Sequence, residues 1–565
     1  MTRGPRLVLL AVIGVGVFLA GLEFMVTAVA LPSILAGLVD PAAGSGWLEL
    51  RKASWIINGY LLVYILTMPM AGRLADLWGT RRLLMGALTV FVVGSTLAGA
   101  AQSLDQLIAA RMVQAVGGGV LVPVGTAAAS HLFGGAARPR ALGVVGALTF
   151  LGMAAGPVVG AAILASVHPE TTLAGASGTT ADLLTPAWRW VFYLNIPIGV
   201  VALALAWAAS PDWDTPRRAG RVDLVGAGLF GLVLAAGLLG LTLLGSTSVA
   251  GSTIPPVLVT VALVAAAAIA TALAVVRGLR VHDPFLDPRL FRSVQFSSAA
   301  LVSLLTGYAF ATAIIGGAVF VDRVLYGGPD QQRLALGALA GATAAGALVS
   351  GFVVRVLSVR LVALVGIALS IGALVAMSTW TSGVPLDAVA LALGVYGFGF
   401  GLTVTPRSTA AVEAAGRRAF GTASAVVTVA RMLGMAVGLA ILTAYGSTTI
   451  DRVYDEVYAT PQAYLQFIPA PLRDRPLRDA FVVAALEEWA SREAATIMVG
   501  LFVVAAAVSA IAIPPALALG GRHGSRPRML DRAPAPGDAK DASDASAGGG
   551  SDADGLEAPE PGIAL

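Results

Sequence analysis

The chain of 565 residues is 57% hydrophobic and 12% charged, with a mean hydropathy of +0.84. Soluble domains carry about 25% charged residues, so this composition excludes an ordinary soluble protein and indicates membrane-spanning helices. The sequence has no cysteine, and its four histidines lack metal-binding spacing, so neither disulfides nor a metal site is expected. The formal net charge of +4 reflects loop arginines, and no nucleic-acid partner is expected.

Continuous apolar stretches of about 20 residues predict fourteen transmembrane helices. A β-barrel is not expected, because the stretches do not alternate between apolar and polar residues. The expected fold is therefore an all-α membrane protein. The predicted spans cover residues 7–35, 54–76, 83–102, 105–133, 139–166, 187–209, 223–245, 254–277, 293–321, 334–356, 358–380, 386–409, 418–446 and 493–518.

The loop arginines predict the orientation, since cytoplasmic loops of membrane proteins are enriched in Lys and Arg. Most of them fall in the loops on the side of the N-terminus, with Arg407 assigned to the loop that follows residues 386–409. Both termini are therefore expected in the cytoplasm, with the chain crossing the cell inner membrane many times.

The order of the spans predicts two six-helix bundles. A faint internal repeat supports this division, because residues 72–81 align with residues 351–360, with glycine first and arginine last in both strings. Parallel repeats of six-helix halves occur in transporters. The expected domains are 1–210 (N-terminal bundle), 211–285 (two linker helices), 286–520 (C-terminal bundle) and 521–565 (a disordered cytoplasmic tail rich in Gly, Ala, Asp and Pro).

The segment 447–492 within the second bundle is too long for a simple connection. Apolar residues recur at helical spacing from Ile450 to Tyr458 and again from Phe481 to Trp489. This pattern predicts a periplasmic helical hairpin that extends the last two spans. Its apolar stripes either pack only on each other or form a surface for lipid or a partner.

Glu23 is the only charged residue between positions 7 and 35. A charge at membrane depth costs about 2.5–3.5 kcal/mol on insertion scales, so such a residue usually has a function. A low dielectric favours the neutral form of a carboxyl group, which suits a group that takes up and releases protons. The alternative is a structural Glu that hydrogen-bonds to a neighbouring helix.

The connection between the second and third spans contains Gly72, Asp76, Gly79, Arg81 and Arg82. Gly72 permits close helix approach and Gly79 permits a tight turn. Asp76 offers acceptors to a facing helix N-terminus or to an arginine such as Arg417 or Arg418, while Arg81 and Arg82 suit the membrane interface. This string closely resembles the loop signature of the major facilitator superfamily, in which it forms part of the cytoplasmic gate.

Further strings resemble signatures of the same family, in the family's order. Glu23 precedes Ala30-Leu31-Pro32 as in the family's first-helix motif, and Arg111 to Gly118 is similar to the arginine motif associated with proton coupling. The sequence departs from these signatures at several positions. In the first-helix motif Glu23 replaces the usual Asp, and Met25 and Ala28 replace the usual Thr and Asn; Leu77 stands where a basic residue is usual, and Ala115 where Gly is usual.

The fifth span and the start of the sixth resemble the superfamily's exporters. The string that resembles their antiporter motif contains Gly152, Gly156, Pro157 and Gly160. Its glycines give a smooth face for close helix packing, and its proline weakens the helix locally. Residues 188–197 resemble a signature of the fourteen-helix drug:proton antiporters. That family includes mycobacterial triacylglyceride exporters, whose second helix is similar to residues 60–69 here.

The resemblance implies a proton-driven antiporter and not an enzyme, with protons as the coupling ion and no other cofactor. Glu23 and Arg111 are the expected proton-coupling residues. The expected cavity residues are Asn58, Tyr60, Gln114 and Arg431. Each has a structural alternative: the arginines as donors to backbone carbonyls, Asn58 and Gln114 as interhelical hydrogen-bonding groups, and Tyr60 as a packing residue.

Two cargo classes stay open. Lipophilic or cationic small molecules such as drugs follow from the family, and Glu23 in a cavity would attract cations. A lipid such as triacylglyceride is the alternative, exported with the help of the 447–492 hairpin. Membrane lipids are the other expected partners, and the resemblance implies a monomer. A channel, a membrane enzyme and a non-transporting receptor fit the sequence less well.

Overall fold

The computed structural model describes residues 3–38, 55–135, 137–167, 183–208, 223–243, 255–416, 419–458, 463–474 and 479–520. Within these ranges the chain is helical and contains no strand. The tail 521–565, predicted to be disordered, lies outside the described residues.

Long helices follow the predicted order. The N-terminal group comprises α1 (Arg3–Leu38), α3 (Trp55–Trp78), α4 (Thr80–Ala100), α5 (Leu104–Leu132), α6 (Ala137–Ser166), α9 (Arg189–Tyr193) and α10 (Asn195–Ala208). Two linker helices follow, α11 (Leu224–Leu243) and α12 (Pro256–Arg280). After the short η2 (Pro288–Arg292), the C-terminal group comprises α13 (Val294–Val319), η3 (Phe320–Val324), α14 (Pro329–Val353), α15 (Val359–Met377), α16 (Leu386–Ala415), α17 (Phe420–Tyr458), α18 (Ala480–Ile511) and α19 (Ile513–Leu517).

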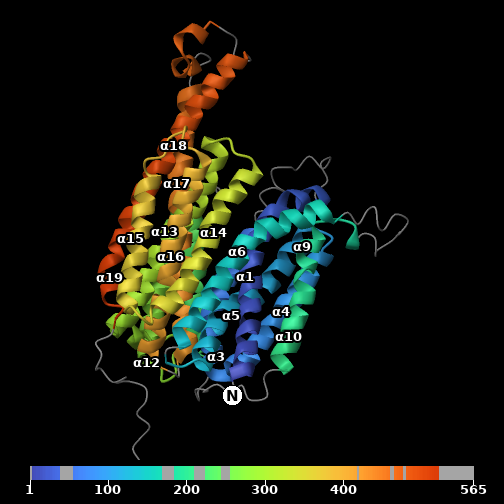
Figure 1. The fold of residues 1–565 in the computed structure, drawn as a ribbon, viewed down its shortest axis with the longest axis vertical. Coiled ribbons are helices and arrows are strands. Elements are labelled where there is room, and N and C mark those ends of the chain that lie inside the picture. Colours follow the sequence, from blue (N-terminus) through green and yellow to red (C-terminus); the bar gives the residue numbers. More distant parts are fainter. Residues whose placement is uncertain are drawn as a thin grey trace, which may run out of the picture. The chain divides into compact units, whose positions relative to one another are not determined.

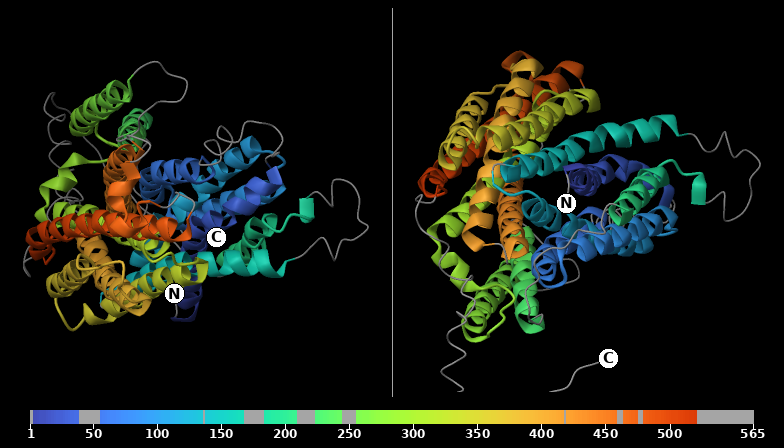
Figure 2. Two further views of the ribbon diagram at one scale, coloured as in Figure 1. Left: turned by 90° about the horizontal axis from the view of Figure 1, so that it is seen from above. Right: turned by 60° about the horizontal axis from the view of Figure 1, so that its bottom comes forward.

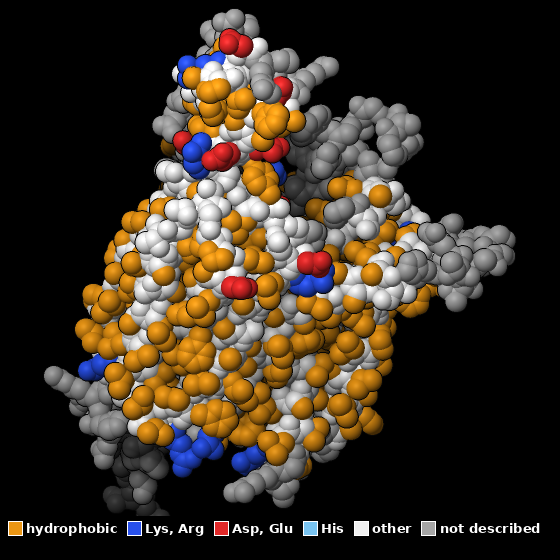
Figure 3. Space-filling model, turned by 45° about the horizontal axis from the view of Figure 1, so that its top comes forward, with side chains coloured by type: hydrophobic (Ala, Val, Ile, Leu, Met, Phe, Trp, Pro, Cys, Tyr) orange, Lys and Arg blue, Asp and Glu red, His pale blue; other side chains and the backbone are white. Residues whose placement is uncertain are grey.

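The described ranges hold 13 helices that are long and apolar enough to cross a membrane. The all-α membrane fold is thus confirmed. The apolar stretch of α11 is shorter and ends at Gly240, so the count of fourteen spans stays a prediction. Hydrophobic side chains cover the visible sides of the helices, and charged ones gather toward their ends (Figure 3).

The two groups of helices lie side by side and meet along two seams (Figures 1 and 2). In one seam α3 packs against α17, and in the other α6 packs against α14. Linker helix α11 contacts both α3 and α17, so it lies beside the first seam. Between the seams, the facing surfaces of the two groups surround the small cavity described below.

The two ends of the helix groups differ in character. At the end we call the basic end, α1 begins and α3 turns into α4 beside Arg81 and Arg82. At the opposite end, the extended end, α17 continues to Tyr458 and α18 begins at Ala480, so both project beyond their neighbours (Figure 1). The side chains of the predicted stripe from Ile450 to Tyr458 lie outside the described residues.

The projecting arm of α18 is fastened near its base, between residues 487 and 491. Ser491 donates a hydrogen bond to the carbonyl of Val324 at 2.8 Å, and Tyr326 donates one to the carbonyl of Glu487 at 2.7 Å. Between these two contacts, the ring of Trp489 lies 4.3 Å from the ring of Phe467. These contacts give the extension side-chain packing of its own, with η5 (Ala463–Phe467) and η6 (Ala470–Leu472) between its two arms.

The linker helices are joined by a charged hydrogen bond. Asp223 precedes α11 and accepts from Arg277 of α12 at 2.8 Å and from the backbone N–H of Gly226 at 2.9 Å. Burial raises the pKa of Asp223, but the hydrogen bonds from Arg277 and Gly226 outweigh this effect and hold the pKa below its usual value. The charged carboxylate therefore stabilises the α11–α12 pair.

We expect Asp223→Asn to destabilise the protein by about 1–3 kcal/mol, since Asn keeps the helix cap but loses the charge. A depressed pKa contributes stability above the unfolded-state value of about 3.9, and this stability is lost as pH falls through the folded-state value. The difference in melting temperature between wild type and Asp223→Asn in detergent should therefore be full at pH 7 and shrink below about pH 4. A difference independent of pH would contradict this origin. Asp223→Ala, which also removes the cap, should be less stable than Asp223→Asn.

Candidate functional site

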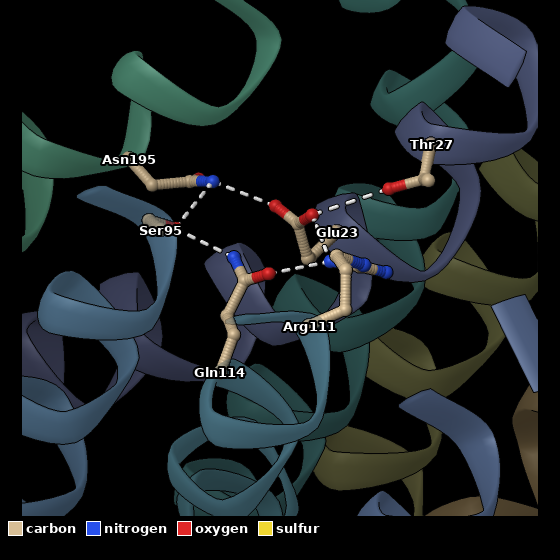
Figure 4. A network of polar contacts seen from close by, with 6 residues as sticks. All are labelled: Glu23, Thr27, Ser95, Arg111, Gln114 and Asn195. Carbon is tan, nitrogen blue, oxygen red and sulfur yellow. Dashed lines mark hydrogen bonds and ion pairs between the residues drawn. The ribbon is translucent and has the colours of Figure 1, made fainter. Parts of the chain in front are cut away.

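Glu23 lies on α1, and its side chain is completely buried inside the N-terminal group. Its carboxylate forms an ion pair with Arg111 of α5 and accepts hydrogen bonds from Asn195 of α10 at 2.6 Å and from Thr27 at 3.2 Å (Figure 4). A charge is tolerated in such surroundings only when it is paired and hydrogen-bonded. The two residues predicted to couple protons therefore meet in one ion pair.

Gln114 and Ser95 complete this polar network. Gln114 lies one turn after Arg111 on the same face of α5, accepts from it at 2.5 Å, and donates to the Ser95 hydroxyl at 2.6 Å. Asn195 donates to the same hydroxyl at 3.2 Å. Four helices, α1, α4, α5 and α10, thus meet through these side chains (Figure 4). Gln114 is therefore an interhelical partner, the structural alternative considered for it.

Sequence reasoning assigned no role to Asn195 or Ser95. Asn195 falls within the string 188–197 and begins the otherwise apolar helix α10, where the structure buries it. A polar amide next to an apolar stretch is a sequence signal that could have pointed to an interhelical contact. Ser95 is one serine on an otherwise ordinary span, and nothing in the sequence distinguishes it. Arg189, in the same string as Asn195, donates to the carbonyls of Gly99 and Ala101 at 2.6 Å and so secures the end of α4.

Tyr60 of α3 covers the guanidinium of Arg111. The Arg111 Cζ lies 4.0 Å from the centroid of the Tyr60 ring and 5.6 Å from that of Phe192. Such contacts stabilise a cation by about 0.5–2 kcal/mol. The Tyr60 hydroxyl and the Arg111 Nε are buried and have no hydrogen-bond partner among the described residues. Tyr60 thus contacts the Glu23–Arg111 ion pair directly, and a change in the charge of that pair would act on α3.

The glycines of α6 hold this helix against α1. The predicted string lies in the middle and second half of α6: Gly152, Gly156, Pro157 and Gly160. A Cβ at Gly152 would overlap the carbonyl oxygen of Phe18, and one at Gly156 would lie 2.8 Å from the Cβ of Met25. These close approaches place α6 on the segment of α1 that carries Glu23. The string is therefore a packing surface next to the Glu23–Arg111 ion pair.

A cavity of about 40 Å³ lies between the two helix groups. Its polar lining comes from α5, α6, α16 and α17 and includes Thr126, Thr149, Arg407, Ser408, Thr428 and Arg431. A neighbouring cavity of about 20 Å³ shares Thr149, Phe150 and Arg431 and adds Tyr64. Of the four predicted cavity residues, Arg431 lines both spaces. Neither includes Tyr60 or Gln114, which belong to the Glu23 network, and Asn58 is exposed near the start of α3.

The placement of Arg407 in a cytoplasmic loop was wrong. The helical pattern continues through residues 409–415, so α16 runs on to Ala415 and carries Arg407 inside the protein with 2% of its side chain exposed. It donates to the hydroxyl of Thr306 on α13 at 2.7 Å. The sequence count treated an arginine near a span end as a loop residue, because composition alone does not show where a helix stops.

Asp76 joins the two helix groups at the basic end. Its carboxylate accepts hydrogen bonds from the backbone N–H groups of Gly421 at 2.8 Å and Thr422 at 2.9 Å, and from the Thr422 hydroxyl at 2.7 Å. These N–H groups belong to the first turn of α17, which has no internal acceptor for them. Asp76 thus caps a helix of the other group, and the charge also suits the positive end of the helix dipole.

The glycines aligned by the internal repeat lie at equivalent places in the two seams. A Cβ at Gly72 would lie 2.5 Å from the carbonyl oxygen of Gly421 on α17. In the other seam, a Cβ at Gly351 would lie 2.8 Å from the carbonyl oxygen of Pro139 and 3.1 Å from the Cα of Gly143, both on α6. Both seams are therefore closed backbone to backbone at the basic end.

The remaining residues of the 72–82 string shape the turn between α3 and α4. Gly79 has a φ of 89°, a conformation that favours glycine, as the predicted tight turn requires. Arg81 is half-buried and Arg82 is exposed in the first turn of α4. Arg73, which the sequence analysis did not single out, is 3% exposed and lies 3.9 Å from Asp283.

Two helix groups joined by two seams around a central cavity define the fold of a secondary transporter. A model of the Major Facilitator Superfamily matches residues 13–439, and the chain belongs to this family. It is therefore a transporter and not an enzyme.

Similar proteins fall into the same family. The chain is 29% identical to a triacylglyceride transporter of Mycolicibacterium hassiacum, with 74% of this chain and 76% of that protein covered. It is 28% identical to a multidrug resistance protein B homolog of Mycobacterium tuberculosis, with 72% and 71% covered. Among solved structures, it shares the fold of the proton:xylose symporter XylE (12% identity, TM-score 0.54, 90% and 95% covered) and of the human organic anion transporter MFSD10 (15%, 0.55, 90% and 100%).

We expect Asp76→Ala to open the basic end. Loss of a helix cap costs about 1–2 kcal/mol, which corresponds to a shift of about 5- to 30-fold toward the open form. The chain has no native cysteine, so Ala425→Cys, placed at the Gly72 contact where the side chain is buried, reports opening through its rate of maleimide labelling. Thr422→Val, which keeps both backbone donors, is the control and should raise the rate much less. Equal labelling in all three backgrounds would contradict a capping role.

Proposed function

We propose that this transporter is a proton-coupled exporter of lipophilic small molecules that works by alternating access, with Glu23 as the group that carries the proton. The observation that carries the proposal is the complete burial of Glu23 in an ion pair with Arg111. Protonation of Glu23 would remove one charge and leave the Arg111 guanidinium buried without a counter-ion. Because an unpaired buried charge is costly, uptake of one proton would favour a rearrangement of the helices around it.

Rearrangement would spread through the contacts of the network. Glu23 is on α1, which packs on α6, and Arg111 is covered by Tyr60 of α3. Helices α6 and α3 form the two seams with the C-terminal group. A change at the ion pair therefore acts on the two helices that join the halves, which is the link that coupled transport requires.

The closed basic end supports a direction for the cycle. If this end faces the cytoplasm, as the loop arginines predict, the structure has its cytoplasmic side sealed by Asp76 and the two glycine contacts. Glu23 would then take up a proton from outside, and opening of the basic end would afterwards release that proton to the cytoplasm. In this proposal both termini are cytoplasmic, the chain functions as a monomer in the inner membrane, and protons serve as the coupling ion.

The charges around the cavity bear on the cargo. Glu23 was expected to attract cations from a cavity, but it is paired with Arg111 and does not line either described space. The charged side chains that do line the cavity are Arg407 and Arg431. This arrangement supports neutral or anionic cargo over cationic cargo. The similarity to a multidrug resistance protein B homolog supports a small lipophilic molecule as cargo.

A lipid cargo is the second candidate. Its support is the similarity to proteins named triacylglyceride transporters, including one of Mycobacterium tuberculosis that is 28% identical, with 80% of this chain and 85% of that protein covered. The extension formed by α17 and α18 gives this candidate a structural element that could guide a long apolar molecule away from the membrane.

Glu23→Gln should abolish uphill transport and leave the fold intact, because Gln keeps the hydrogen bonds but cannot exchange a proton. The measurement uses the purified protein in liposomes with an imposed pH gradient and two labelled cargoes, a lipophilic dye and a triacylglycerol. Glu488→Gln, on an exposed part of α18, is the matched control and should transport like wild type. Uphill movement of either cargo at the normal rate by Glu23→Gln would refute the coupling role.

The same liposomes separate the two cargo classes. We expect a chain in which residues 448–485 are replaced by a short Gly/Ser linker to retain transport of the dye, because the contacts at Glu487 and Ser491 that fasten α18 remain. A lipid exporter that depends on the extension should instead lose triacylglycerol movement. Loss of dye transport in a correctly folded protein would contradict our preferred cargo class.

A further inference from the structure

Two arginines of the C-terminal group are buried against the central cavity. Arg407 on α16 is 2% exposed and Arg431 on α17 is 8% exposed, and both line the cavity of about 40 Å³. Because both guanidiniums face the same small cavity, their like charges repel each other. Two like charges at one cavity are costly unless something of opposite charge shares it.

Neither arginine has an anionic partner among the described residues. Arg407 donates to the neutral hydroxyl of Thr306, and its Cζ lies 4.9 Å from the ring of Phe400. Arg431 lies 5.5 Å from the ring of Phe150, and its buried Nε has no hydrogen-bond partner. Ring contacts offset only part of the cost of burying a cation.

The other three buried arginines of the described helices show what is missing. Arg111 has the carboxylate of Glu23, Arg73 lies 3.9 Å from the carboxylate of Asp283, and Arg189 has two backbone carbonyls. Between residues 294 and 441 the sequence has four acidic residues, and each is exposed near a helix end: Asp322, Asp330, Asp387 and Glu413. The described part of the C-terminal group thus supplies no carboxylate to the cavity.

The lining of the cavity suits an oxyanion. The two guanidiniums line it together with the hydroxyl of Ser408, while the hydroxyls of Thr126, Thr149 and Thr428 donate to backbone carbonyls of their own helices. Guanidinium groups bind carboxylates and phosphates with paired, charge-assisted hydrogen bonds, so the two arginines would supply most of the donors to a bound oxyanion. The volume admits a small charged group and not a whole amphiphile, so an attached chain would have to extend beyond the cavity.

We propose that Arg407 and Arg431 bind an oxyanion carried by the cargo, so that the transported molecules are amphiphiles with a carboxylate or phosphate headgroup. This inference rests on the proposed export function for its physiological meaning. The binding site itself can be tested without transport. The bound anion would take the place of the missing carboxylate and bring the facing surfaces of the two helix groups together around one charge.

The test measures ligand-induced thermal stabilisation of the full chain in a neutral detergent. Three ligands are compared: dodecyl phosphate, dodecyltrimethylammonium and inorganic phosphate. Dodecyl phosphate should raise the melting temperature in a saturable way, and the cation should not. Arg407→Gln and Arg431→Gln should each weaken dodecyl phosphate binding about tenfold or more, as expected for loss of a charged hydrogen bond. Arg333→Gln, in an exposed ion pair with Asp330, should bind like wild type.

Arg431→Met gives a second readout that does not depend on the ligand. Removing an unpaired buried charge should raise the melting temperature of the ligand-free protein while reducing binding, whereas removal of a merely structural arginine should lower the melting temperature. This opposite effect on stability and binding separates a ligand site from a folding contact.

Three outcomes would overturn the proposal. Equal stabilisation by the anionic and cationic amphiphiles would show that no charge-selective site exists, and so would unchanged binding in both Gln variants. If inorganic phosphate stabilises the protein as well as dodecyl phosphate does, the site binds free anions, and the proposal that it binds the headgroup of an amphiphile is wrong. Dodecyl phosphate binding that persists in Glu23→Gln would support the site independently of proton coupling. If dodecyl phosphate does not bind while Glu23→Gln still abolishes uphill transport, the proposed cargo class is wrong and the proposed role of Glu23 stands.

Discussion

The free energy of placing charge in an apolar interior governs this structure. Glu23 and Arg111 are tolerated inside the N-terminal group because each neutralises the other and because three amide or hydroxyl side chains form hydrogen bonds with them. The C-terminal group has buried guanidiniums without that balance. The two halves of the fold are therefore both helical, but their buried charges differ. The charges of Glu23 and Arg111 in the N-terminal group neutralise each other, whereas Arg407 and Arg431 in the C-terminal group have no anionic partner among the described residues.

The sequence predicted the fold and the positions of several contacts, and the reasons are physical. Burying Glu23 requires a counter-ion, and Arg111 was the one strong candidate in the same half. Of the two partners expected for Asp76, a helix N-terminus or an arginine, the structure shows the helix N-terminus, because a glycine at position 72 allows α17 to approach closely. Arg407 was misplaced and Ser95 was missed, because the end of a helix and the partner of a lone hydroxyl depend on tertiary packing that composition does not encode.

The two seams at the basic end share one design. In each, a glycine of one group lies against the backbone of the other, so contact is made over a small area without long side chains. A strong polar contact at the seam of α3 and α17 is the cap that Asp76 provides for α17. Closure there is specific in geometry, as the proposed alternating-access cycle would require of a contact that is broken and remade.

Helix α17 has a mechanical consequence. One uninterrupted helix of 39 residues carries the cap contact at its first turn, Arg431 at the cavity and one arm of the extension at its far end. At 1.5 Å per residue it is about 58 Å long, so a tilt of about 10° about its first turn displaces its tip by about 10 Å. In the same tilt Arg431, about 16 Å along the helix from the first turn, would move about 3 Å. The helix would thus act as a lever that magnifies a displacement at the cavity about three- to fourfold at the surface outside the membrane.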